Sequence, residues 1–86
     1  MKIAVPSPLR SYTGEKAQVE ARGKTLEELL QDMDRRYPGV RFRIINEQDQ
    51  IREHIQVFVN GRQARDLSAP LKDADEIQIV CALSGG

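Results

Sequence analysis

One amphipathic segment constrains the fold more than any other part of this sequence. Thr25-Leu26-Glu27-Glu28 has the spacing of a capping box, in which the Thr25 hydroxyl accepts from the Glu28 amide and Glu28 reaches back to the cap. Pro38-Gly39 is a typical helix end. Between these signals, apolar residues recur at helical spacing: Leu26, Leu29, Leu30, Met33 and Tyr37. The sequence therefore predicts one helix, whose apolar stripe the rest of the chain must cover.

Alternation of apolar and polar residues on both sides of that helix predicts a sheet. The predicted strands are residues 2–6, 16–22, 55–59, 62–65 and 76–82. Turn residues at Ser11–Glu15 favour an antiparallel hairpin before the helix, and Asn60-Gly61 favours a second hairpin after it.

Residues 40–54 are open to two interpretations. Phe42 and Ile44 alternate as in a strand, whereas Val40, Ile44 and Ile51 are equally compatible with a short helix and a loop. The polar stretch 46–50 is a loop tip in either case.

The order of these elements favours a β-grasp, or ubiquitin-like, arrangement. A single mixed sheet of four or five strands would cover the helix with one face. The long crossover allows the first and last strands to lie parallel at the centre. We expect an α+β fold in one domain, residues 1–86, with a flexible C-terminal tail at 82–86. The sheet residues expected to cover the helix are Ile3, Val5, Val57, Val59, Ile77 and Ile79.

Length and charge exclude several classes of protein. A chain of 86 residues allows one domain, with a core near the lower limit for independent folding. The 13 Lys and Arg balance 13 Asp and Glu with no basic run, which argues against nucleic acid or anionic lipid as a partner. The chain lacks a stretch of ~20 apolar residues and a secretory signal, so we expect a cytoplasmic protein without membrane contact.

The residues predict neither an active site nor a metal site. His54 has no Cys, Ser or second His spaced to make a catalytic dyad. Cys81, the only cysteine, is in step with the core positions of the last strand. Three carboxylates surround a turn, where such groups are usually solvated: Asp73, Asp75 and Glu76. We expect no catalytic residue, no metal and no bound cofactor.

The C-terminus carries the chemical signal, since the chain reads Ala82-Leu83-Ser84-Gly85-Gly86 directly after the last predicted strand. Glycine lacks a Cβ, so the last two residues can enter a narrow channel in a partner enzyme. The unhindered carboxylate of Gly86 can then be adenylated with ATP and attacked by a sulfur or amine nucleophile. An extended tail would reach roughly 17 Å at ~3.4 Å per residue. The alternative is a frayed end without a role.

Several of these motifs resemble the sulfur carriers of the MoaD/ThiS family. The similarity spans the whole chain, and its motifs are Val59-Asn60-Gly61, Leu71–Ile77, Gly85-Gly86, Leu9-Arg10 and Thr13-Gly14. Within the family, the tail and the opening Pro6-Ser7-Pro8-Leu9-Arg10 most resemble carriers that serve cysteine synthesis. The small subunit of molybdopterin synthase comes next.

The resemblance implies a carrier protein rather than an enzyme. An E1-like enzyme would adenylate Gly86 with ATP, sulfur would replace the AMP to give a thiocarboxylate, and a downstream synthase would take that sulfur. Gly86 would be the attachment site, while Gly85, Ser84 and Leu83 would enter the partner's active site. Where a relative is made with residues after the diglycine, a trimming protease would be a further partner.

Alternation also predicts a docking surface for these enzymes. If the apolar positions of residues 55–59 face the helix, Phe58 points to solvent on the opposite face of the sheet. Val80 shares that face by the same alternation, and Leu9 is expected nearby. The alternative is a lone Phe shielded by Arg stems such as Arg62.

Two other classes of function remain open at this point. In a protein modifier, Gly86 would form isopeptide bonds with lysines. In a ubiquitin-like scaffold that binds without covalent chemistry, Gly85-Gly86 would be incidental.

Overall fold

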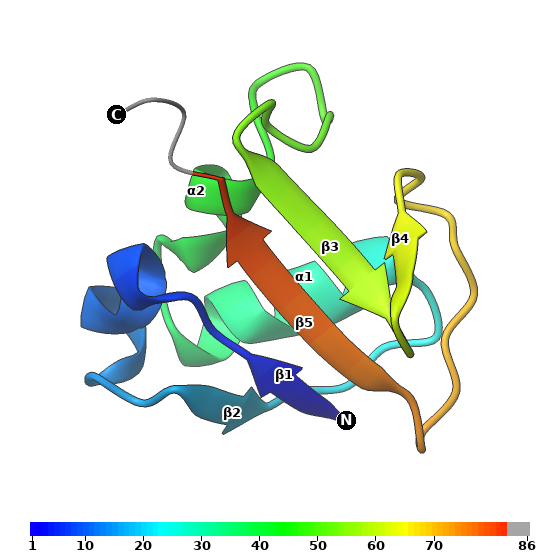
Figure 1. Ribbon diagram of the computed structural model, residues 1–86, viewed down its shortest axis with the longest axis horizontal. Coiled ribbons are helices and arrows are strands. Elements are labelled where there is room, and N and C mark those ends of the chain that lie inside the picture. Colours follow the sequence, from blue (N-terminus) through cyan, green and yellow to red (C-terminus); the bar gives the residue numbers. More distant parts are fainter. Residues whose placement is uncertain (83–86) are drawn as a thin grey trace.

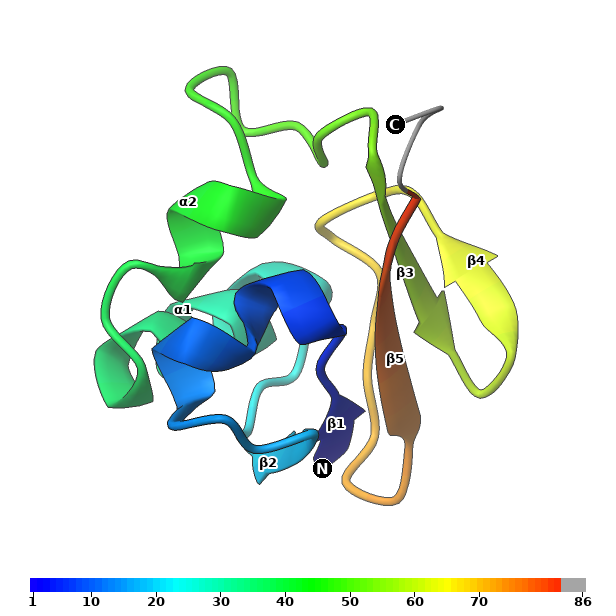
Figure 2. The ribbon, with the colours of Figure 1, turned by 60° about the vertical axis from the view of Figure 1, so that its left-hand side comes forward.

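The computed structural model describes residues 1–82, and these residues have the expected β-grasp arrangement of a five-stranded sheet with helices on one face (Figures 1 and 2). The strands lie in the order β2-β1-β5-β3-β4. The elements are β1 (Lys2–Ala4), η1 (Ser7–Thr13), β2 (Gln18–Glu20), α1 (Leu26–Arg36), α2 (Val40–Ile44), β3 (Ile55–Val59), β4 (Arg62–Ala64) and β5 (Glu76–Cys81). No helix within residues 1–82 has the length and apolar character needed to cross a membrane.

The centre of the sheet is the parallel pair β1 and β5, in which Ile3 is in register with Ile77. β2 and β3 flank this pair in antiparallel orientation, and β4 returns from β3 as the edge strand. Asn60 and Gly61 both have positive φ, 52° and 84°, as a two-residue hairpin turn of type I′ requires. The parallel pairing of β1 with β5 confirms the predicted pairing of the first and last strands.

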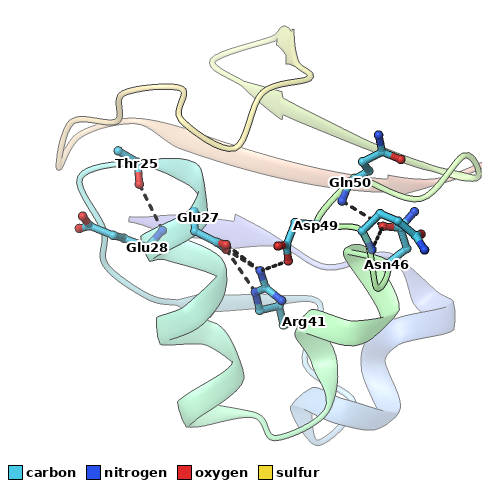
Figure 3. Close-up of polar contacts among 8 residues, drawn as sticks. Thr25, Glu27, Glu28, Arg41, Asn46, Asp49 and Gln50 are labelled. Carbon is cyan, nitrogen blue, oxygen red and sulfur yellow. Dashed lines mark hydrogen bonds and ion pairs between the residues drawn. The ribbon is translucent and has the colours of Figure 1, made fainter.

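α1 begins with the predicted cap. The Thr25 hydroxyl accepts from the Glu28 amide at 3.3 Å (Figure 3). The Glu28 side chain accepts from the Lys24 amide at 3.1 Å, one residue before the cap, rather than from Thr25 itself. The buried apolar residues of the helix are Leu26, Leu29, Leu30 and Met33. They share one core with the buried strand residues Ile3, Val57, Ile77 and Ile79 and with Val5, directly after β1, whereas Val59 is half-buried.

Residues 40–54 adopt the helix-and-loop interpretation. Val40 and Ile44, one helical turn apart, are both buried, and Phe42 between them is exposed. Burial at i and i+4 with exposure at i+2 fits a helix and excludes a strand.

A network around Arg41 fixes the segment between α1 and β3. The Arg41 guanidinium donates to Glu27 of α1 at 2.7 Å and lies 3.6 Å from Asp49 of the following loop (Figure 3). The hydrogen bonds to Glu27 raise the pKa of Arg41. The Asn46 side chain accepts from the amides of Gln48 and Gln50. Short polar contacts therefore hold a loop that lacks regular structure.

Candidate functional site

The C-terminal end of β5 is hydrogen-bonded to the segment that leads into β3. Cys81 is in register with Ile55, and the Ala82 amide donates to the His54 carbonyl at 2.7 Å. Figures 1 and 2 both show α2, the loop after it and this end of β5 at the same end of the molecule. The predicted tail residues lie outside the described part of the chain: Leu83, Ser84, Gly85 and Gly86. The structure thus defines the last position before the tail.

Cys81 and His54 show no catalytic arrangement. The Cys81 thiol is half-buried against the core, and burial raises its pKa, which favours the unreactive neutral form. His54 is exposed and contributes its backbone carbonyl to the β5 end. Among residues 1–82, no group of three or more His, Cys, Asp or Glu side chains could hold a metal ion.

Asp75 and Asn60 make structural contacts rather than a cation site. Asn60 donates to the Asp75 carboxylate at 2.8 Å, and the Asn60 side-chain oxygen accepts from the Glu76 amide at 2.9 Å. Hydrogen bonds from the Lys72 amide and from Asn60 lower the pKa of Asp75. The turn of the β3–β4 hairpin is therefore bound to the start of β5. The motifs Val59-Asn60-Gly61 and Leu71–Ile77, far apart in the sequence, are thus hydrogen-bonded to each other.

The sheet face opposite the helices is open, and Figure 1 looks onto it. Phe58 and Val80 share this face on the neighbouring strands β3 and β5, as alternation predicts. Phe58 is in register with Gln63 and Gln78, and Val80 with Gln56. Both apolar side chains are half-buried rather than exposed. The result is a small apolar centre surrounded by neutral amide side chains.

Two other residues assigned to this face lie elsewhere. The sequence prediction for Leu9 is wrong: Leu9 is 5% exposed and belongs to the core. The chain after Pro6 coils into the 3-10 helix η1, which turns Leu9 and Thr13 inward. Arg62 is in register with Val59, so it projects toward the helix side and does not shield Phe58.

A groove of about 660 Å³ runs between β4 and the loop before β3. Ile51, Val57 and Leu67 are among the apolar residues that line it. Asp66 at its edge accepts hydrogen bonds from Ser68, which lower the pKa of that carboxyl group as in an ordinary solvated turn. The lining residues include no nucleophile beside a base, so the groove does not have the composition of an active site.

Comparisons with known proteins agree with this fold and with the carrier interpretation. The model of the ThiS family matches residues 3–86. The sulfur carrier protein CysO of Mycobacterium bovis is 28% identical over 89 residues, and the alignment covers 98% of this chain and 96% of that protein.

Solved structures give the same picture. The Amycolatopsis orientalis BexX/CysO complex contains a chain that matches with a TM-score of 0.91 and 33% identity, over 99% of this chain and 98% of that one. The small archaeal modifier protein 1 of Methanosarcina acetivorans matches with a TM-score of 0.82 and 26% identity, over 99% of this chain and 94% of that one.

Proposed function

This chain belongs to the ThiS family of ubiquitin-like sulfur carriers, and from that premise we propose that the C-terminal carboxylate of Gly86 is the group that carries the sulfur. An E1-like partner enzyme brings this carboxylate to the α-phosphate of ATP, which forms the acyl adenylate and releases pyrophosphate. A sulfur nucleophile at the oxidation level of hydrosulfide then attacks the acyl carbon, and AMP leaves. The product is a thiocarboxylate, whose sulfur a downstream synthase takes up.

One observation carries this proposal: the family match extends through the diglycine, which follows the central strand β5. β5 ends at Cys81, and the amide of the next residue, Ala82, donates to the carbonyl of His54 just before β3. Four residues follow Ala82 in the sequence, and the last two are glycine. A carboxylate attached in this way can enter another protein's ATP site without unfolding the sheet.

Cysteine synthesis is the favoured pathway for the carried sulfur. The tail and opening motifs resemble carriers of that pathway, and the named relatives are CysO sulfur carriers. Molybdopterin synthase or the synthesis of another metabolite is the alternative. The protein needs no cofactor of its own in either case, because the partner enzyme uses the ATP.

The chemistry is tested by intact-mass spectrometry. After incubation with the cognate activating enzyme, ATP and a sulfur donor, the protein should gain the difference between one sulfur and one oxygen, mapped to Gly86. A variant without Gly86, and one extended past Gly86 by residues that cannot be trimmed, should stay unmodified and folded. Absence of both adenylate and thiocarboxylate from the wild-type protein would refute the carrier mechanism.

The sheet face around Phe58 and Val80 is the proposed docking surface for these enzymes. Phe58→Asp places a charge in its apolar centre and should weaken binding to the activating enzyme while the protein stays folded. Gln18→Asp adds the same charge on β2 of the same sheet and should have little effect. Adenylation of Phe58→Asp at the wild-type rate would place the docking surface elsewhere.

A protein modifier is the second candidate, and the likeness to the small archaeal modifier protein 1 favours it. In this function Gly86 would be transferred to lysine amines rather than to sulfur. Purification of the tagged protein from cells under denaturing conditions distinguishes the two: isopeptide-linked adducts support a modifier, and a free thiocarboxylate supports a carrier.

A further inference from the structure

Phe42 is the one large hydrophobic side chain in residues 1–82 that is strongly exposed, at 53%. Its ring is held in place, since the Arg52 guanidinium carbon lies 4.8 Å from the ring centroid. Arg52 Nε also donates to the Phe42 carbonyl at 2.8 Å. A partner would therefore lose little conformational entropy on binding this aromatic side chain.

The next residue of α2 makes a second arginine–aromatic pair. Arg43 Nε donates to the Tyr12 hydroxyl at 2.6 Å, and its guanidinium carbon lies 5.7 Å from the Tyr12 ring centroid. This contact joins α2 to η1.

The charge of this surface is not neutralised locally. Arg41 is paired with Glu27 and Asp49, but no carboxylate among residues 1–82 lies within ion-pair distance of Arg43 or Arg52. A chain with zero net charge thus carries two guanidinium groups without a carboxylate partner among residues 1–82. That of Arg52 lies over the exposed Phe42 ring, and that of Arg43 belongs to the next residue of α2. Such a surface complements an apolar recess bordered by carboxylates.

Hydrogen bonds connect this surface to the start of the tail. The Arg52 amide donates to the Ile44 carbonyl at 2.9 Å, which holds Arg52 against α2. Two residues later, the His54 carbonyl accepts from Ala82. These two hydrogen bonds link α2 to the end of β5 through residues 52–54, and Figure 2 shows α2 on the helix side of the sheet at the same end of the molecule as that end of β5.

We propose that Phe42, Arg43 and Arg52 form a second docking contact for the activating enzyme, whose matching surface is an apolar recess with acidic side chains around it. This inference rests on the proposed function, because it assumes an enzyme that takes up the C-terminus. The enzyme would hold the carrier on both sides of the sheet, with the tail entering between the two contacts. Charge at this site would speed encounter and strengthen the binding of the carrier to the enzyme.

Arg43→Glu is the first test, and Phe42→Ser is the second. Pyrophosphate release by the activating enzyme, measured against carrier concentration, gives kcat and KM for each variant. Each variant should raise KM about fivefold to tenfold, as loss of a central contact does, with kcat unchanged. Arg62→Glu is the matched control, because it makes the same charge change at an exposed position on β4, beside the hairpin turn, and should leave KM within about twofold.

Salt and direct binding complete the design. Raising the ionic strength should increase the KM of the wild type and reduce its advantage over Arg43→Glu, while Arg43→Lys should restore most of the affinity. The proposed contact is refuted if the wild-type carrier is adenylated normally and the KM values of Arg43→Glu and Phe42→Ser equal that of Arg62→Glu. If the wild type is not adenylated, the proposed function fails. Calorimetry of the carrier with the activating enzyme in the absence of ATP then tests the contact separately, because Arg43→Glu and Phe42→Ser should bind more weakly than the wild type.

Discussion

At the scale of single residues, Gly23 occupies the closest backbone approach found at a glycine in the described chain. A Cβ at this position would lie 2.3 Å from the Leu29 backbone nitrogen and 2.7 Å from the Glu28 carbonyl carbon. These are backbone atoms of α1, so the helix would have to move. Gly23→Ala should therefore lower the free energy of unfolding by about 2–4 kcal/mol in urea denaturation.

Gly61→Asn is the control for that substitution. Gly61 has a φ of 84° but no atom within 4 Å of an added Cβ, and asparagine tolerates positive φ. It should cost less than about 1 kcal/mol. Equal losses at Gly23 and Gly61 would show that backbone freedom, not the contact with α1, makes Gly23 necessary.

Asp32 gives the stability a predictable pH dependence. Its buried carboxylate pairs with Arg35 and Arg36 and accepts from the Arg22 amide at 2.8 Å. The hydrogen bond from Arg35, followed by that from the Arg22 amide, lowers the pKa of Asp32 below its ordinary 3.8. A lowered folded-state pKa adds stability above the unfolded-state pKa and loses it as pH falls through the folded-state pKa.

Asp32→Asn should therefore be less stable than the wild type by about 1–3 kcal/mol at pH 7. The difference should shrink as the pH falls below about 4, because Asp32 of the unfolded wild-type chain is then protonated first and the folded-state carboxylate only at lower pH. Urea denaturation from pH 7 to pH 2.5 measures this, with Glu47→Gln in the exposed loop as control. A difference in unfolding free energy that does not change with pH would mean that Asp32→Asn acts through altered packing rather than through loss of the carboxylate charge.

At the scale of elements, the α1 stripe carries the core. Leu30 is fully buried between the helix and the sheet, so Leu30→Ala removes apolar contacts and leaves a cavity. We expect a loss of about 2–5 kcal/mol, a large share of the stability of so small a domain. Gln31→Ala, at the neighbouring exposed position, is the control in thermal melts. An unchanged melting curve for Leu30→Ala would contradict this assignment of the core.

The elements with local signals could be predicted from the sequence, and those without could not. α1 has a cap, a stripe and a Pro-Gly end, and the strands have alternation and turn residues. η1 shows neither period clearly, because its seven residues bury two side chains, Leu9 and Thr13. In α2, Val40, Phe42 and Ile44 match both a two-residue and a four-residue period. Only the exposure of Phe42 in the folded protein distinguishes them.

The same limit applies to the candidate site. Alternation correctly placed Phe58 and Val80 on one face, because register within a sheet follows from the pleat. It could not place Leu9, whose direction depends on a helix that the sequence does not signal. The sequence also could not show that Arg43 and Arg52 lack carboxylate partners among residues 1–82. A partner can lie far away in the sequence, as Tyr12 does from Arg43.

At the scale of the whole molecule, the core and the tail should be separable. Every buried hydrophobic residue of the described chain lies between Ile3 and Ile79. A chain ending at Ala82 should therefore melt within about 2 °C of the full-length protein, since surface changes cost little. Calorimetry measures this difference. A chain ending at Ile79 also loses the pairing of Val80 and Cys81 with β3 and should melt clearly lower. A large loss at Ala82 would mean that the tail contributes to the fold.

The central position of β5 has a consequence for protein synthesis. β5 joins β1 to β3, so the hairpins β1–β2 and β3–β4 share no strand until residues 76–81 have left the ribosome. A chain that stalls earlier lacks the β5 residues that cover the apolar stripe of α1, so it stays incompletely folded and is exposed to proteolysis. Translation must therefore reach the segment next to the tail before the domain can fold. Proteases that spare folded proteins should therefore remove most polypeptides that end before β5 is complete.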